Sequence, residues 1–296
     1  MSTRFHVGAK SLQGPIAAYA KRFDLLEVSV RIDDGEADEA GPARRGSPKV
    51  APDTRLPKAA RNGVPANAKA ALHAATTKAA AKTGAPAATT PTMSTLRKWR
   101  KQVPPHFDFS VVGGPHLARV RPSADLEREV AVALEAIAAL QARCLVLRTP
   151  PDVTPSALWR ERLEKLFARF PRDATNVVWE PSGLWETGDA AVLAKKCGVV
   201  LGVDAAREPV PAGTIAYVRL RAMGETRSFG ESTLERIVRS IGVRRDVYVI
   251  LETDSALEEC KRLRRVAQRS KASTSGGMGR LVRPRGGIVV RDDEQE

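Results

Sequence analysis

The sequence contains few of the residues that build metal and redox sites. Its three cysteines, Cys144, Cys197 and Cys260, are odd in number, far apart and without a C-x-x-C pair, which indicates reduced structural thiols. The four histidines show no H-x-x-x-H or H-E-x-x-H spacing, which argues against a histidine-built zinc site. Aromatic residues are only 5% of the chain, which favours an aliphatic α/β core over an aromatic-rich β-sandwich.

Long apolar runs are missing as well. No stretch approaches the length of a membrane span, and the opening MSTRFHVGAK does not have the charged and then apolar build of a secretory signal. No phosphate-binding P-loop occurs either. We therefore expect a cytoplasmic protein with no membrane partner.

Positive charge is abundant but unevenly placed. Residues 41–93 hold nine Lys or Arg and one Asp, and residues 261–296 hold ten Lys or Arg and four acidic residues, which together account for the net charge of +14. The basicity thus belongs to two appendages, whereas the rest of the chain is neutral. Because flexible basic arms can neutralise phosphates without reading sequence, non-specific nucleic-acid binding is one hypothesis for these segments.

Eight apolar runs bounded by turn residues are candidate strands. Most are continuous and rich in Val, Ile and Leu, as in strands of a parallel sheet that are covered on both faces. The runs are 5–9, 25–30, 107–112, 144–149, 176–180, 199–205, 215–221 and 247–253. Helical periodicity occurs between them, most clearly from Ser123 and from Ser156. This alternation predicts an α/β fold, a TIM-like (β/α)8 barrel.

Two segments fall outside the predicted barrel, which we assign to 1–32 plus 94–268. Residues 33–93, inserted after the second strand, are rich in Ala, Lys and Pro with almost no large apolar residue, and we expect this low-complexity insertion to be disordered. Residues 269–296 form a predicted flexible basic tail with an acidic end. The sixth unit is short, with REPVPAG in place of a full helix.

Charged residues gather at the ends of the predicted strands. In such barrels the strand C-termini point into the active site. The charged tips are Glu27, Arg148, Glu180, Asp204, Arg219, Arg221 and Glu252. Since each unpaired charge would cost several kcal/mol in a dry core, we expect a wet, polar pocket at this end.

The tips allow more than one chemistry. The carboxylates of Glu27, Glu180, Asp204 and Glu252 could hold a divalent cation such as Mg²⁺ or Mn²⁺, or could divide acid and base roles. Arg148, Arg219 and Arg221 could hold an anionic substrate, with Trp185 lining the pocket or covering its rim. The alternative is an internal salt-bridge layer without turnover, in which Arg219 pairs with Glu180 or Asp204.

The order of the motifs resembles a known family. FHVGA, YAKRFDLLEV, TLRKWRKQVPPHFDFSV, VLRTPP, VVWEP, VDA, YVRLRAMG and DVYVILETD occur in the order seen in the domain of unknown function 72, or YecE-like, family. The resemblance covers nearly all of 1–32 and 94–268. It implies a TIM-like barrel of unsettled activity, whose shape has been compared with endonuclease-IV-like and xylose-isomerase-like barrels.

The resemblance also implies site residues. The family's polar positions fall on Glu27, Glu180, Asp204 and Arg219 of this chain. Others differ, because Val112 replaces a lysine, Arg148 a glutamine, Pro181–Ser182 an arginine-histidine pair, and Glu252–Thr253 paired asparagines. The resemblance and the charged tips together predict a hydrolytic or isomerising enzyme. The alternative is a non-catalytic binding protein whose basic arms contact nucleic acid.

Overall fold

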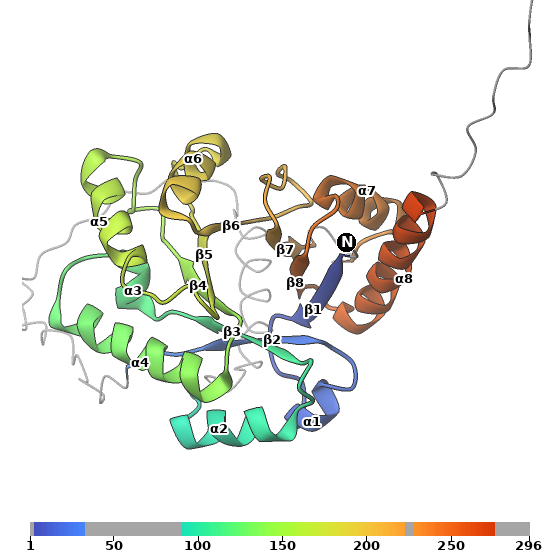
Figure 1. Ribbon diagram of the computed structural model, residues 1–296, viewed down its shortest axis with the longest axis horizontal. Helices are drawn as coiled ribbons and strands as arrows, with labels where there is room; N and C mark the ends of the chain where they lie inside the picture. The colour runs from blue at the N-terminus through green and yellow to red at the C-terminus, as the bar shows by residue number, and fades with distance from the viewer. Residues whose placement is uncertain (1–2, 33–89, 223–227, 276–296) are drawn as a thin grey trace, which may run out of the picture. The chain divides into compact units, whose positions relative to one another are not determined.

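The computed structural model describes residues 3–32, 90–222 and 228–275. Eight parallel strands close into a barrel in sequence order, with β1 hydrogen-bonded to β8 (Figure 1). The strands are β1 (Arg4–Ala9), β2 (Leu25–Ser29), β3 (Asp108–Val112), β4 (Cys144–Arg148), β5 (Asn176–Glu180), β6 (Val200–Val203), β7 (Ile215–Arg221) and β8 (Asp246–Glu252). The predicted fold class is confirmed, and each predicted strand is present within two residues of its expected limits.

Helices cover the outside of the barrel. They are α1 (Ile16–Tyr19), α2 (Met93–Gln102), α3 (Pro115–Arg119), α4 (Ala124–Leu140), α5 (Ala157–Phe167), α6 (Thr187–Cys197), α7 (Glu231–Ile241) and α8 (Ala256–Ser275). No helix lies between β6 and β7, as the REPVPAG segment predicted. The predicted barrel limit at residue 268 falls inside α8, which continues to Ser275. No helix in the described ranges is long and apolar enough to cross a membrane.

The disorder predicted for 33–93 and the flexibility predicted for 269–296 fall almost wholly outside the described residues. The described residues before and after the insertion together form one compact barrel unit.

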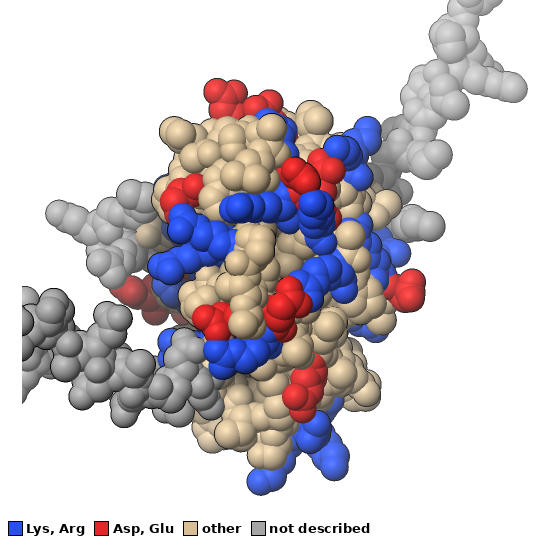
Figure 2. Space-filling view, turned by 90° about the vertical axis from the view of Figure 1, so that its left-hand side faces the viewer, with Lys and Arg blue, Asp and Glu red and all other residues tan. Residues whose placement is uncertain are grey.

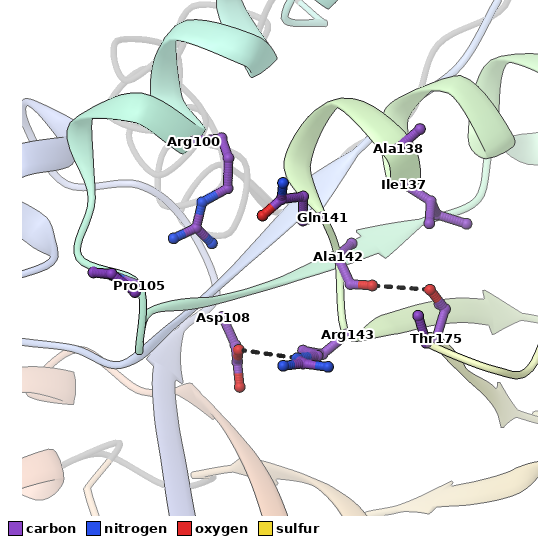
Figure 3. A pocket seen from close by; sticks show the side chains of 10 residues that line it. Arg100, Pro105, Asp108, Ile137, Ala138, Gln141, Ala142, Arg143 and Thr175 are labelled. Atoms are coloured by element: carbon purple, nitrogen blue, oxygen red, sulfur yellow. Dashed lines mark hydrogen bonds and ion pairs between the residues drawn. The ribbon is translucent and has the colours of Figure 1, made fainter.

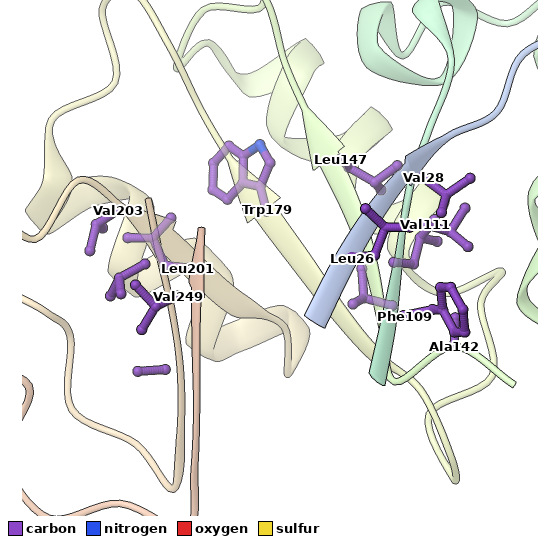
Figure 4. Close-up of a cluster of buried hydrophobic side chains, with 14 of the residues drawn as sticks. Leu26, Val28, Phe109, Val111, Ala142, Leu147, Trp179, Leu201, Val203 and Val249 are labelled. Carbon is purple, nitrogen blue, oxygen red and sulfur yellow. The ribbon is translucent and has the colours of Figure 1, made fainter. Parts of the chain in front are cut away.

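Successive side chains of each strand point to opposite faces of the barrel wall, so the strands contribute to two apolar layers. Outward residues such as Leu26, Val111, Leu147 and Trp179 pack under the helices (Figure 4). A second, smaller cluster comes from the alternate positions of the strands and fills the barrel interior: Leu25, Val112, Cys144, Val146, Val178, Tyr217, Tyr248 and Ile250. Both faces of the strands are therefore buried, which is why the strands appear in the sequence as continuous apolar runs.

Charges on the outer face of α4 and α5 are mixed in sign. Figure 2 shows blue and red side chains interleaved on this side of the molecule. Several are paired, for example Arg169 with Glu127 and Lys165 with Glu161. Exposed pairs of this kind contribute little to stability.

Candidate functional site

The carboxyl ends of the strands hold a buried ion cluster centred on Arg219. Its side chain is 2% exposed and lies among the carboxylates of Glu27 from β2, Glu180 from β5 and Glu252 from β8. Arg219 is on β7, where alternation directs Tyr217, Arg219 and Arg221 into the barrel. Four of the predicted strand tips, Glu27, Glu180, Arg219 and Glu252, therefore meet. They form a buried ion cluster around the guanidinium of Arg219, not the wet pocket that the sequence predicted.

Arg219 donates six hydrogen bonds. Its Nε contacts both Glu180 oxygens, at 3.2 and 3.1 Å, and its Nη2 contacts Glu180 Oε1 at 2.9 Å and Glu27 Oε1 at 2.6 Å. Its Nη1 donates to Glu27 Oε2 and to Glu252 Oε1, both at 2.9 Å. An arginine carries five N–H groups, so every donor of Arg219 is engaged by a carboxylate.

Two further arginines lie at the solvent side of this cluster. Arg148 Nε is 3.3 Å from Glu180 Oε2, and Arg221 Nε donates to Glu252 Oε2 at 3.2 Å. Their side chains are 44% and 41% exposed, and within the described part of the chain their terminal Nη atoms have no hydrogen-bond partner. These two residues, unlike Arg219, can therefore donate to a ligand.

Sequence reasoning missed three residues of this end of the barrel. Tyr217 donates its hydroxyl hydrogen bond to Glu27 Oε1 at 2.6 Å, and Lys10 Nζ lies 3.8 Å from Glu252 Oε2. Strand alternation would have pointed to Tyr217, two residues before Arg219. Gly202 on β6 makes room for Glu180, because a Cβ there would lie 2.6 Å from Glu180 Cγ.

Two predicted site residues lie apart from the cluster. Asp204 accepts the backbone N–H of Ala206 at 3.1 Å and lies 3.5 Å from Arg207, and no ion pair or hydrogen bond joins it to Arg219. Trp185 is buried edge-on against Trp179, and its indole N–H donates to the Val153 carbonyl at 2.6 Å. Asp204 as an acid/base group and Trp185 as a substrate contact stay predictions.

The environments of the glutamates differ. Burial raises the pKa of Glu180 above its ordinary value, although the Arg219 charge acts in the opposite direction. Burial would also raise the pKa of Glu252, but the charges of Arg219, Lys10 and Arg221 outweigh it and lower that pKa. Glu252 is therefore held as a carboxylate, whereas Glu180 is the group more easily protonated.

The predicted divalent cation does not fit this arrangement. The three carboxylates direct their oxygens at the Arg219 guanidinium, which occupies the position that a shared cation would take. In the described ranges no group of three His, Cys, Asp or Glu side chains has metal-ligand geometry.

A second charged layer closes the opposite end of the barrel. His6 on β1 bridges two aspartates, with Nδ1 at 2.9 Å from Asp108 and Nε2 at 3.4 Å from Asp246. Its ring stacks on Tyr248 at a centroid distance of 4.9 Å. Burial would lower the pKa of His6, but the hydrogen bonds and charges of Asp108 and Asp246 outweigh it and raise that pKa.

This layer predicts a pH-dependent stability. A histidine whose folded pKa is raised stabilises the fold below its unfolded pKa of about 6.5, and the contribution is lost as pH rises through the folded pKa. His6→Gln should therefore lower the free energy of unfolding at pH 6 by on the order of 1–2 kcal/mol, and by less at pH 9. Urea unfolding at both pH values measures this, with the exposed His106→Gln as control. A His6→Gln deficit that is independent of pH would contradict it.

Comparisons with known proteins agree with the barrel geometry. The family model described as "Protein of unknown function DUF72" matches residues 89–280. A DUF72 family protein from Enterococcus faecalis is similar in structure, with a TM-score of 0.57 and 13% identity over 90% of this chain and 96% of that one. A DUF72 family protein from Thermotoga maritima gives a TM-score of 0.53 and 14% identity over 91% and 99%. Among curated proteins, none matches the sequence.

Proposed function

The chain belongs to the DUF72 family of proteins of unknown function, and from this premise we propose that it is an enzyme that binds a small anionic molecule at the carboxyl end of the barrel. The observation that carries the proposal is the pair Arg148 and Arg221, half-exposed and with uncommitted Nη donors above a buried cluster. Guanidinium groups of this kind suit carboxylate or phosphate groups.

Each residue has a separate role in the proposal. Arg148 and Arg221 bind the anionic group. Arg219, Glu27 and Glu252 form the hydrogen-bonded base of the site and fix the positions of its side chains. Glu180 acts as the general acid or base. Its pKa is raised, and it lies beside Arg148, which binds the anionic group of the substrate. A carboxyl group whose pKa is raised by burial can serve as a general acid or base near neutral pH, as in hydrolases and isomerases.

Charge removal at the mouth tests the binding step. Arg148→Met and Arg221→Met should each weaken the binding of an anionic substrate about 10-fold or more, since each removes a charge-assisted hydrogen bond. The substrate would come from turnover assays with a panel of phosphoesters and sugar phosphates, and calorimetry would give the affinities. Arg97→Met on α2, which breaks an exposed pair with Glu135, is the matched control.

Glu180→Gln separates catalysis from binding. We expect it to lower kcat by about 10²-fold or more and to leave binding nearly unchanged, as for loss of a general acid or base. Binding without turnover in the wild type would favour the non-catalytic binding protein instead. No binding of any anion at the mouth would reject both forms of the proposal and leave a structural ion layer.

The second hypothesis, nucleic-acid binding, depends on the basic segments 41–93 and 261–296. More than half of the basic residues of the second segment lie in α8, where Arg264 pairs with Asp24 and Arg269 with Glu231. The remaining residues of both segments lie almost wholly outside the described ranges, so this partner stays a prediction.

A further inference from the structure

A cavity lies at the amino ends of the strands, at the opposite end of the barrel from the Arg219 cluster. Its volume is about 350 Å³, within the size range of small-molecule sites. The end of α2, the start of β3, the end of α4 and the segment before β5 line it, and it is partly open to solvent (Figure 3). The labelled lining residues are Arg100, Pro105, Asp108, Ile137, Ala138, Gln141, Ala142, Arg143 and Thr175.

Two arginines give this cavity a positive wall. Both Nη groups of Arg100 donate to backbone carbonyls, those of Phe107 at 2.9 Å and Pro104 at 2.8 Å, so this guanidinium is fixed in place. Burial lowers the pKa of Arg100, and the Asp108 charge acts in the opposite direction. Figure 3 shows Arg100 and Arg143 extending toward the same space from opposite sides.

The side chain of Arg143 is less constrained than that of Arg100. Its side chain is 58% exposed, and its sole ion pair with a described residue is a long one, 3.8 Å from Nε to Asp108 Oδ1. Asp108 is itself shared, because its Oδ2 is 2.9 Å from His6 Nδ1. The terminal nitrogens of Arg143 and the side-chain amide of Gln141 have no hydrogen-bond partner within the described ranges, so both can donate to a ligand.

The other side chains that line the cavity are short, and they are apolar or weakly polar. Ala138 and Ala142 keep the α4 side of the cavity open, and Ile137 and Pro105 add apolar surface. Thr175 Oγ1 donates to the Ala142 carbonyl at 3.0 Å and can still accept a hydrogen bond. A compact apolar group therefore fits beside the arginines, with a hydroxyl or amide near Thr175.

From this arrangement we propose that the cavity is a second ligand site, which binds a small organic anion, a carboxylate or phosphate with a compact apolar body. Arg143 and Gln141 donate to the anionic group, and Arg100 supplies a fixed positive charge. Two guanidinium groups face one carboxylate in this cavity, and that carboxylate is already engaged by His6. The site is independent of the proposed function at the mouth.

Phenyl phosphate is the probe that tests this site, titrated by calorimetry into the full chain and into the Arg148→Met/Arg221→Met double variant. The double variant removes anion binding at the mouth, so the binding that remains reports the cavity. We expect Arg143→Ala to weaken this remaining binding 10-fold or more. Inorganic phosphate, which lacks the apolar body, should bind more weakly than phenyl phosphate.

Arg245→Ala is the matched control. Arg245 is also 58% exposed, also pairs through Nε with an aspartate, Asp246 at 2.8 Å, and lies at the same end of the barrel, but it does not line the cavity. It should change the affinity less than twofold. Ala138→Leu, at an exposed helical position, fills the cavity and should abolish binding with little change in Tm.

Three outcomes would overturn the proposal. The first is no binding of phenyl phosphate to the double variant at millimolar concentration. The second is an equal loss of affinity in Arg143→Ala and Arg245→Ala, which would mean that the probe follows general surface charge. The third is unchanged binding in Ala138→Leu. None of these results bears on Arg148 and Arg221, so the proposed function at the mouth stands or fails separately.

Discussion

Arg219→Met should lower the free energy of unfolding at pH 7 by about 4 kcal/mol or more, because it leaves buried carboxylates without their shared partner. Glu27, Glu180 and Glu252 each accept hydrogen bonds from Arg219, so a single substitution removes the counter-charge of all three. The peripheral Arg148 and Arg221 keep one partial contact each, with Glu180 and Glu252.

The loss of unfolding free energy in Arg219→Met should become smaller as the pH falls. Without Arg219 the carboxylates repel one another and lie in a poorly hydrated space, which raises their folded pKa values. A group with a raised folded carboxyl pKa destabilises the fold above that pKa, and protonation removes the penalty. The wild type behaves in the opposite way at Glu252, whose lowered pKa makes its contribution disappear as pH falls. The difference between Arg219→Met and wild type should therefore shrink between pH 7 and pH 4.

Urea unfolding at pH 7 and pH 4 measures both effects. Arg219→Lys is the control, because it keeps a positive charge but cannot reproduce the planar fork that reaches three carboxylates. We expect it to fall between wild type and Arg219→Met. A change below 1 kcal/mol in Arg219→Met at pH 7 would show that the cluster is hydrated well enough to do without its centre.

Gly8→Ala should destabilise the barrel by on the order of 3 kcal/mol, at the upper end of the range for overpacked sites. An added Cβ would overlap the Leu25 carbonyl oxygen and lie 2.9 Å from the Leu25 carbonyl carbon. Gly8 is paired with Leu25 where β1 meets β2. The two strands pair through two residues each, Gly8 with Leu25 and Ala9 with Leu26. The contact is with backbone, so no side-chain rotation can relieve it, and the two strands must separate.

Gly188→Ala provides the comparison, because a Cβ at this position in α6 meets no atom within 4 Å. In a helix the same change should be neutral or stabilising by about 0.4–1 kcal/mol. Midpoints of thermal or urea unfolding for the two variants would separate close packing from the general effect of replacing glycine. Equal midpoints would mean that β1 and β2 can move apart without loss.

Much of the fold could be predicted from local sequence. Val177–Val178 and Val247–Leu251 are parts of apolar runs because the strands are buried on both faces, and helical periodicity marks α4 and α5 between them. The short connection after β6 was evident from its proline and glycine content. These are properties of neighbouring residues, which a sequence displays directly.

The site was only partly predictable. Glu27, Glu180, Arg219 and Glu252 were placed at strand ends and do meet there, but the sequence also left Asp204 as a partner for Arg219. In the structure Asp204 instead accepts the Ala206 N–H in a local turn. The layer of His6, Asp108 and Asp246 was not anticipated, although all three lie near the first residues of strands.

The sequence by itself thus determined which segments are strands and helices, and that charged side chains end several strands. Only the tertiary structure decided that the carboxylates of β2, β5 and β8 converge on one arginine of β7, and that Arg148 and Arg221 keep free donors. The physical reason is that closure of the barrel brings together residues as distant as Glu27 and Arg219, which are 192 positions apart. Which charges pair is set by distance and hydration in that closed space, which no stretch of sequence contains.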